Sequence, residues 1–276
     1  PSTNIAKIAE KKYLKIIPDF FSCNHDLSKK FINETKVIYA ANVICHIPDL
    51  NNLIKNVDKF LSKDGLFIFE EPYLGSMIEK VSYDQIYDEH IYIFSVSSIK
   101  KIFDEFSFEL IDTIPQTTHG GSMRYVLARK GQYDIQNSVN KIEDSEKKIK
   151  LDSFEGLLEF KKKCLLSKEQ TLNSIQEYKK KGFSISGYAA TSKSTTILNF
   201  CGIDKKLIDC IYDTTPDKIG KFSPGMHIPI INYNEFKNNY PDVVYLFAWN
   251  HKEEIFKKEE VYNKRGGKWF SHVNLK

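Results

Sequence analysis

Apolar residues follow two alternating patterns over residues 1–131. Short continuous apolar runs predict buried strands at 14–17, 36–41, 65–69, 108–114 and 123–128. Apolar residues spaced three and four apart predict helices, at 49–61 and 96–106. Strands that alternate with helices indicate an α/β fold with a parallel sheet.

The pattern changes at two further points along the chain. Residues 132–181 are rich in Lys, Glu and Ser, and their leucines and isoleucines lie at helical spacing, which predicts one or two long helices that link two domains. From residue 182 a second strand–helix alternation begins, which predicts a smaller doubly wound sheet over 182–276.

Composition excludes several classes of protein. The net charge of +4 comes from scattered lysines, so we expect no nucleic-acid partner. No stretch approaches the ~20 apolar residues of a membrane span, and no signal peptide is visible, so we expect no membrane partner. The five cysteines form no Cys-x-x-Cys pair, which predicts reduced thiols in a cytoplasmic protein and no metal site in this chain.

Residues 83–95 carry the most chemistry. Two aspartates, Glu89, His90 and three tyrosines, Tyr87 among them, follow the predicted strand 65–69. Polar residues interleaved with aromatics after a strand are typical of a cleft. His90 lies beside Glu89. A histidine, whose free pKa is ~6.5, is suited to accept a proton near neutral pH. The alternative is a surface helix end with packed tyrosines and solvated charges.

A second polar group follows the predicted strand 36–41. Asn42 and His46 lie between this strand and the helix 49–61, and polar residues at the carboxyl ends of parallel strands face the ligand crevice. The unit as a whole resembles the second half of class I S-adenosylmethionine-dependent methyltransferases. On spacing alone, His46 is equally consistent with a structural and a catalytic role.

A set of motifs extends the resemblance to almost the whole chain. In order they are 70–75 (EEPYLG), 83–95, 119–125 (HGGSMRY), 187–193 (GYAATSK), 199–203 (NFCGI), 213–218 (DTTPDK), 224–229 (PGMHIP) and 248–250 (AWN). Together they resemble the sugar C-methyltransferases, which methylate a ring carbon beside the keto group of a nucleotide-linked deoxysugar.

The resemblance implies a fold, a cofactor and a set of site residues. The fold is α/β: a partial class I methyltransferase Rossmann-like sheet (1–131), a helical linker (132–181) and a smaller Rossmann-like domain (182–276). The cofactor is S-adenosylmethionine, and the partner is a nucleotide sugar. The implied catalytic residues are His90 as base, Glu89, Tyr87 and His46. The implied cofactor contacts are Asp19, Phe20, Ala41 and Asn42. The implied substrate contacts are Tyr73, His119, Arg124 and Lys193.

Three of these residues have a simpler interpretation. Asp19 either accepts from the adenine amino group, with Phe20 covering the ring, or caps the next turn. Arg124 either meets phosphate or pairs with a carboxylate. Lys193, at a small-residue turn that opens a helix, either binds diphosphate or is a surface lysine.

The sequence also departs from the family. Members begin with a cysteine-rich zinc domain and a Gly-rich cofactor loop, and neither occurs in these residues, so we expect the chain to be the carboxyl-terminal two-thirds of such an enzyme. Zinc is then expected only in the missing domain. Two alternative functions stay open: a nucleotide-sugar epimerase or dehydratase, which uses the same base, and a noncatalytic sugar-nucleotide-binding fragment.

Overall fold

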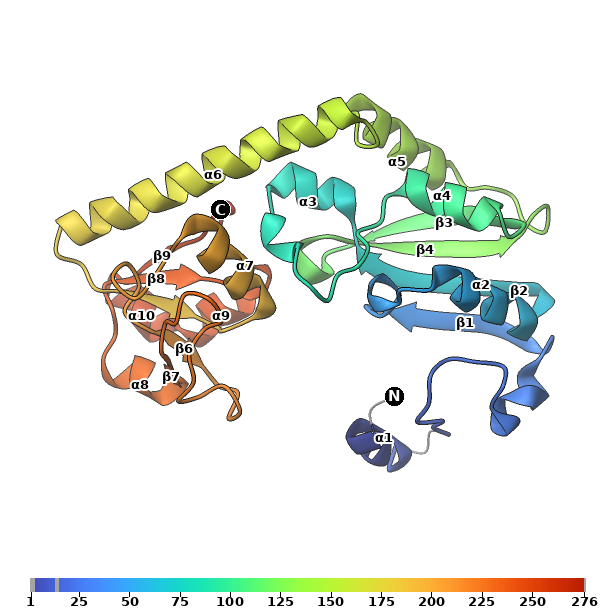
Figure 1. Cartoon of the computed structure of the whole chain (residues 1–276), viewed down its shortest axis with the longest axis horizontal. Helices are drawn as coiled ribbons and strands as arrows, with labels where there is room; N and C mark the ends of the chain where they lie inside the picture. Colours follow the sequence, from blue (N-terminus) through green and yellow to red (C-terminus); the bar gives the residue numbers. More distant parts are fainter. Residues whose placement is uncertain (1–2, 13–14, 276) are drawn as a thin grey trace. The chain divides into compact units, whose positions relative to one another are not determined.

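A computed structural model describes residues 3–12 and 15–275 of the chain (Figure 1). It has an α/β fold with two sheets that contain parallel strands. The chain forms two compact units, each discontinuous in sequence. The amino-terminal unit comprises Pro1–Glu71, Ile91–Gln116 and Met123–Glu146, and the carboxyl-terminal unit comprises Pro72–His90, Thr117–Ser122 and Lys147–Lys276. The domain boundaries predicted from the sequence stay a prediction.

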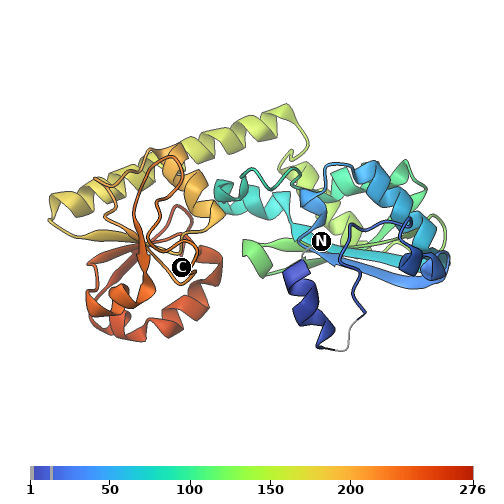
Figure 2. The same ribbon diagram turned by 60° about the horizontal axis from the view of Figure 1, so that its bottom comes forward.

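The amino-terminal unit contains a four-stranded sheet in the order β1-β2-β4-β3, drawn in blue and green in Figure 2. Its strands are β1 (Thr35–Ala41), β2 (Leu61–Pro72), β3 (Phe108–Gln116) and β4 (Ser122–Arg129). Its helices are α1 (Thr3–Glu10), α2 (Leu50–Phe60), α4 (Val96–Asp104) and α5 (Asn137–Lys148), with short 3₁₀ turns η1 (Asp26–Phe31) and η2 (Ile44–His46).

Strand β1 is less buried than its sequence predicts. It pairs in parallel with β2 and has no second neighbour in the described sheet. Val37 and Tyr39 are therefore 52% and 55% exposed, although the apolar run predicts burial on both faces. The strand predicted at 14–17 is wrong for its described part, because residues 15–17 have no regular structure; residue 14 lies outside the described residues.

Aromatic side chains fill the core of this unit. Phe69 of β2 lies 5.0 Å from Tyr125 of β4 and 5.9 Å from Phe103 of α4, measured between ring centroids. Phe67 and Phe108 extend the same cluster. These rings attach α4 to the sheet, so the carboxyl end of β2 is held on a rigid support.

The carboxyl-terminal unit contains a five-stranded sheet in the order β7-β6-β5-β8-β9. All of its neighbouring strands are parallel. The strands are β5 (Ile185–Tyr188), β6 (Ile211–Asp213), β7 (Ile230–Asn232), β8 (Val243–Leu246) and β9 (Lys268–Phe270). The order reverses between β5 and β8, and ligands in open α/β sheets bind outside the carboxyl ends of the strands at such a switch point.

Helices and 3₁₀ turns complete this unit. The helices are α3 (Leu74–Lys80), α6 (Phe154–Lys180), α7 (Ser192–Cys201), α8 (Tyr233–Asn238), α9 (Lys252–Lys258) and α10 (Glu260–Lys264). The turns are η3 (Tyr83–Gln85), η4 (Thr118–Gly120) and η5 (Trp249–His251). Helix α7 packs against both α6 and η3, which brings residues 83–85 to the sheet domain although they are distant in sequence.

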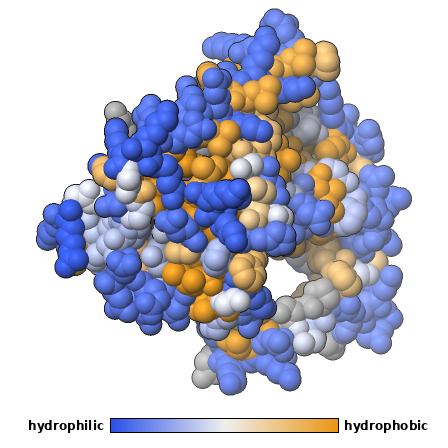
Figure 3. Space-filling view, turned by 60° about the vertical axis from the view of Figure 1, so that its left-hand side comes forward, coloured by the Kyte–Doolittle hydropathy of each residue, from blue (hydrophilic) through white to orange (hydrophobic). Residues whose placement is uncertain are grey.

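The surface carries both hydrophilic and apolar side chains (Figure 3). Part of the apolar contribution comes from α6, on which Phe154, Leu157 and Leu166 are exposed. Scattered apolar residues of this kind are normal on folded proteins. Among the described residues, no helix combines the length and apolar character of a membrane span.

A buried carboxylate stabilises the core of the carboxyl-terminal unit. Glu259 is buried, and its Oε1 accepts hydrogen bonds from the hydroxyls of Tyr188 (2.7 Å) and Tyr233 (2.5 Å). Burial, and then the hydrogen bond to Glu259, raise the pKa of both tyrosines, so both hydroxyls stay protonated and can donate. These two hydrogen bonds hold Tyr188, the last residue of β5, close to the switch point.

We predict that Glu259→Ala lowers the free energy of unfolding of this unit by about 2–4 kcal/mol, because it leaves two buried hydroxyls without their acceptor. Glu259→Gln keeps an oxygen for both hydroxyls and should cost about 1 kcal/mol or less. Urea titration followed by the fluorescence of Trp269, which packs against Tyr188, measures both. Exposed Glu260→Ala is the matched control, and equal losses from Glu259→Ala and Glu260→Ala would contradict the assignment.

Candidate active site

Residues 83–90 fold into a compact turn that joins Tyr87 to His90. The Tyr87 hydroxyl lies 2.8 Å from His90 Nε2, and the two ring centroids are 4.0 Å apart. His90 Nδ1 lies 2.8 Å from the carbonyl oxygen of Gln85. A carbonyl oxygen only accepts, so Nδ1 carries the proton of the neutral ring, and Nε2 presents its lone pair to Tyr87. The backbone thus sets the tautomer of His90.

The same segment forms one wall of a cavity of about 520 Å³ within the carboxyl-terminal unit. Ile86, Tyr87, Asp88 and Glu89 line this wall, and Glu89 is exposed. Helix α7 forms the opposite wall with Ser192, Thr195, Thr196 and Asn199. The cavity has a size typical of small-molecule sites.

The wall formed by α7 is polar because polar residues recur at helical spacing along one face of this helix. Ser192, Thr195 and Asn199 lie on one face, three and four residues apart. Thr191 caps the helix by accepting from the Ser194 amide at 3.2 Å. Thr196 donates to the Ile86 carbonyl at 3.1 Å, which ties this helix to the segment that bears Tyr87.

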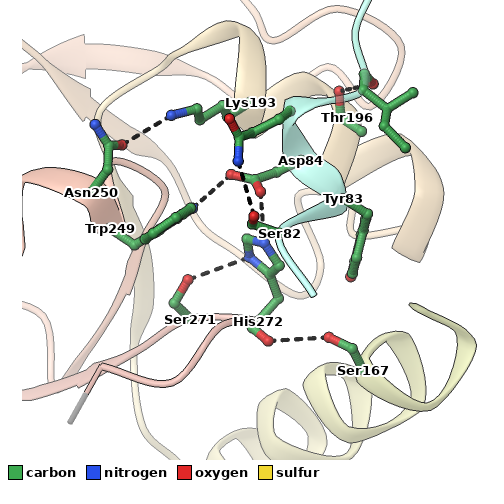
Figure 4. Close-up of polar contacts among 12 residues, drawn as sticks. Ser82, Tyr83, Asp84, Ser167, Lys193, Thr196, Trp249, Asn250, Ser271 and His272 are labelled. Carbon is green, nitrogen blue, oxygen red and sulfur yellow. Dashed lines mark hydrogen bonds and ion pairs between the residues drawn. The ribbon is translucent and has the colours of Figure 1, made fainter. Parts of the chain in front are cut away.

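Lys193 lies at the start of α7 and is buried, not a surface lysine. Its Nζ lies 3.1 Å from Asn250 Oδ1 and 5.5 Å from the ring centroid of Trp249 (Figure 4). Burial lowers the pKa of the Lys193 amino group, and the negative charge of Asp84 opposes that shift. Lys193 therefore places a cation at the carboxyl ends of β5 and β8, where the sheet has its switch point.

In the amino-terminal unit, the carboxyl ends of the parallel strands β1 and β2 meet. Ala41 pairs with Glu70, and the Asn42 amide donates to the Glu70 carbonyl at 2.8 Å. Asn42 has a positive φ of 54°, so the chain turns sharply after β1. His46 follows in η2 and is half-buried.

Glu71 holds this turn in place. Its carboxylate is fully buried, and Oε1 accepts from the amides of Val43 (2.9 Å) and Ile44 (2.6 Å). Burial raises the pKa of the neighbouring Cys45 thiol, and the hydrogen bond and negative charge of Glu71 raise it further. The thiol therefore stays protonated, and Glu71 acts as the anchor for the loop that carries His46.

Asp19 and Phe20 line a common pocket of about 440 Å³ in the amino-terminal unit. Phe20 is 76% exposed. Asp19 Oδ1 accepts from the amide of Phe20 at 2.7 Å. This bond is local, as the capping alternative requires, but the carboxylate also faces the pocket with an aromatic ring beside it.

The remaining candidate residues separate into two groups. Tyr73 is buried at the amino end of α3, and His119 is exposed in η4 with a positive φ of 51°. Both belong to the carboxyl-terminal unit. Arg124 belongs to the amino-terminal unit, and its Nη2 donates to Glu70 Oε2 at 2.9 Å. Arg124 thus makes the carboxylate pair that the sequence left as one alternative, and its phosphate role stays a prediction.

Comparisons with known proteins find two family models that together match almost the whole chain. A family model described as the C-methyltransferase C-terminal domain matches residues 117–273, and one described as a methyltransferase domain matches residues 7–113. The first match covers more than half of the chain. The chain belongs to the C-methyltransferase family.

A curated relative agrees with this family. The C-methyltransferase NovU of Streptomyces niveus is 26% identical over 273 residues, which cover 98% of this chain and 64% of the relative. The chain therefore spans less than two thirds of that protein. Among solved structures, the PH0226 protein of Pyrococcus horikoshii OT3 is 14% identical over 47% of this chain and 68% of that one, with a TM-score of 0.34, too low to bear on the fold.

Sequence reasoning missed two buried carboxylates beside the candidate residues. Glu71 and Asp84 both lie inside quoted motifs, but neither was singled out, and both are fully buried. Groups distant in sequence donate to these carboxylates. Amides of the β1–α2 loop donate to Glu71, and the indole of Trp249 donates to Asp84. The available signal was an acidic residue near the end of an otherwise apolar strand, as Glu71 is.

We predict that iodoacetamide alkylates Cys45 much more slowly than the half-buried Cys23 at pH 8. The raised pKa of the Cys45 thiol leaves almost no thiolate, and the side chain is buried. Glu71→Gln removes the negative charge, lowers the pKa of Cys45 towards its ordinary value and should increase its rate several-fold. Burial is the larger cause, so the rate should stay below that of Cys23. Mass spectrometry of the two cysteine peptides measures both rates. An alkylation rate of Cys45 that is the same in Glu71→Gln and in the wild type would contradict the effect of Glu71 on the Cys45 thiol.

Proposed function

We propose that the full-length protein transfers a methyl group from S-adenosylmethionine to a ring carbon beside the keto group of a nucleotide-linked 4-keto-deoxysugar. The observation that carries this proposal is the Tyr87–His90 pair, in which Tyr87 lines a cavity of small-molecule size and faces His90 Nε2, which is held as an acceptor. The name of the relative NovU, a C-methyltransferase, supports the same reaction class.

Methylation at carbon requires a base because a C–H carbon is not a nucleophile. A neighbouring ketone makes the proton removable, since the electron pair of the broken C–H bond moves into a C=C bond and the carbonyl π pair moves to oxygen as an enolate. His90 Nε2 accepts the proton, and Gln85 stabilises the resulting imidazolium through Nδ1–H. The enolate carbon would then form the new C–C bond to the methyl group as the methyl–sulfur bond of the sulfonium breaks and its electron pair stays on sulfur.

Tyr87 has a role that changes with the protonation of His90. In the structure its hydroxyl donates to His90 Nε2. Because Nε2 has a single lone pair, the hydroxyl must leave it before Nε2 can accept the sugar proton, and it is then available to donate to the enolate oxygen. Glu89, exposed on the same cavity wall, is positioned to accept from a sugar hydroxyl.

The opposite wall suits the remainder of a nucleotide sugar. Ser192 and Thr195 offer hydroxyls, and the amino end of α7 favours an anionic group such as a diphosphate. Lys193 lies at the same helix end but outside the residues that line this cavity, with its Nζ against Asn250. We therefore assign the sugar to the Tyr87 side of the cavity and the diphosphate to the α7 side.

The described residues fit one part of the cofactor. Asp19 and Phe20 would hold the adenine through a carboxylate and an aromatic face, and Ala41 and Asn42 lie at the end of β1, where a ligand of this sheet binds. His46 lies on the same strand-end loop, anchored by Glu71. S-adenosylmethionine, when bound, supplies an electrophilic methyl group on a sulfonium.

We predict that His90→Asn in the full-length protein lowers kcat for methyl transfer by about 10²–10⁴-fold, because the base is lost. His227→Asn, an exposed position with positive φ, is the matched control and should leave kcat unchanged. The assay incubates the protein with S-adenosylmethionine and a dTDP-4-keto-deoxysugar and follows the product by mass spectrometry.

The same assay separates the alternatives. Without S-adenosylmethionine, the wild type should exchange the reactive sugar hydrogen for solvent deuterium, and His90→Asn should not. Deuterium exchange with no methylation in the complete assay would favour an epimerase or dehydratase. Binding without exchange or methylation would leave a noncatalytic sugar-nucleotide protein, and full turnover by His90→Asn would refute the assigned base.

We predict that Thr195→Val raises KM for the nucleotide sugar by about 5–10-fold and leaves kcat nearly unchanged. The substitution preserves shape but removes a hydroxyl from the cavity wall, which is worth about 1 kcal/mol in a hydrogen bond. Initial-rate kinetics measure both constants. A fall in kcat with constant KM would show instead that α7 acts on the chemical step.

A further inference from the structure

The residue that joins the candidate catalytic segment to the carboxyl-terminal sheet is Asp84. Its carboxylate is fully buried in η3, immediately before Gln85, whose carbonyl sets the tautomer of His90. Trp249 Nε1 donates to Asp84 Oδ2 at 2.7 Å, and His272 Nε2 lies 3.1 Å from Asp84 Oδ1 (Figure 4). A buried carboxylate needs such donors, since it has lost its hydration.

The partners of His272 determine which of its nitrogens carries the proton. The hydroxyl of Tyr245 accepts from the His272 backbone amide at 3.0 Å and lies 3.2 Å from Nδ1. Burial holds the pKa of Tyr245 well above its ordinary value, so it keeps its proton, and Nδ1 is the ring nitrogen that this hydroxyl and the Ser271 hydroxyl (3.4 Å) both face as donors. Nε2 then carries the ring proton and faces Asp84, although the contact is at ion-pair distance and not aligned as a hydrogen bond.

Both Asp84 oxygens therefore face donors, and the two donors come from the carboxyl-terminal sheet. Trp249 follows β8 at the switch point, and His272 follows β9. The Gly120 backbone fits closely against the Trp249 ring, because an added Cβ would lie 2.0 Å from it. The indole is thus fixed on its other side, and it cannot follow Asp84 if the segment moves.

We propose that Asp84 is a positioning residue that fixes residues 83–90 on the switch point of the carboxyl-terminal sheet, and so holds the Tyr87–His90 pair in register with the cavity. The consequence of this proposal for catalysis rests on the proposed function. Asparagine has the shape of aspartate but replaces one acceptor oxygen by an NH₂ donor, so Asp84→Asn sets a donor against Trp249 or His272. The segment would then be tied to α7 through Thr196, which donates to Ile86, and through Tyr83, which contacts Cys201 and Phe200.

Hydrogen–deuterium exchange of the full-length protein tests the positioning. The amides of residues 85, 86 and 90 donate to the carbonyls of Ser82, Tyr83 and Tyr87, so they exchange slowly while the segment is docked. We expect Asp84→Asn to accelerate their exchange about 10-fold or more. Glu79→Gln, an exposed carboxylate on the neighbouring α3, is the matched control and should leave the exchange unchanged. Unchanged exchange in folded Asp84→Asn would overturn the proposal.

Steady-state kinetics test the consequence for catalysis. Misplacement of a catalytic group by about 1 Å costs roughly 10²-fold, so we expect Asp84→Asn to lower kcat about 10–100-fold with KM changed less than threefold. Trp249→Phe keeps an aromatic, though smaller, ring and removes one donor; it should shift exchange and kcat in the same direction by less, and it serves if Asp84→Asn does not fold. Faster exchange with wild-type kcat would overturn the positioning role.

The two measurements keep this proposal separate from the proposed function. Exchange needs neither substrate nor cofactor, so it reports on Asp84 even in a protein that does not methylate a keto sugar. Failure of the wild type to methylate, with accelerated exchange in Asp84→Asn, would reject the sugar substrate and retain the anchor.

Discussion

A carboxylate that loses its hydration must receive hydrogen-bond donors from the protein, and the carboxyl-terminal unit meets this requirement for Asp84 with Trp249 and His272. This constraint determines the conformation of residues 83–90. Because the carboxylate cannot leave its donors at low cost, the adjoining Gln85 carbonyl stays beside His90 Nδ1. The orientation of the imidazole, and with it the chemistry assigned to Nε2, follows from a residue that itself meets no ligand.

The amino-terminal unit uses the same device independently. Glu71, buried at the end of β2, accepts two amides of the loop that carries His46. In each unit a buried acid thus links a loop to the end of a rigid sheet: Glu71 lies in the strand and accepts from the loop, whereas Asp84 lies in the attached segment and meets donors that follow β8 and β9. Candidate site residues are placed on loops, as is common in enzymes, but the loops are attached through charge-assisted hydrogen bonds.

Local patterns predicted much of this arrangement. The α/β class, the helix of residues 50–60 and the opening of a helix at the small-residue turn that bears Lys193 follow from patterns that neighbouring residues determine. The exposure of β1 could not be predicted, because a strand's apolar run does not reveal how many neighbours it has. Asp84 was missed for a related reason: its donor Trp249 lies 165 residues away in sequence, and only the fold brings the two together.

The central claim is that the fold holds His90 as a neutral ring with Nδ1 protonated and Nε2 available as the acceptor. Nitrogen-15 NMR of histidine-labelled full-length protein at pH 8 tests it directly, because the two tautomers give distinct shifts at each ring nitrogen. The structure predicts a protonated Nδ1 and an unprotonated Nε2 for His90. A protonated Nε2 with a free Nδ1 would contradict the account, since the ring would then present a donor where a base is required.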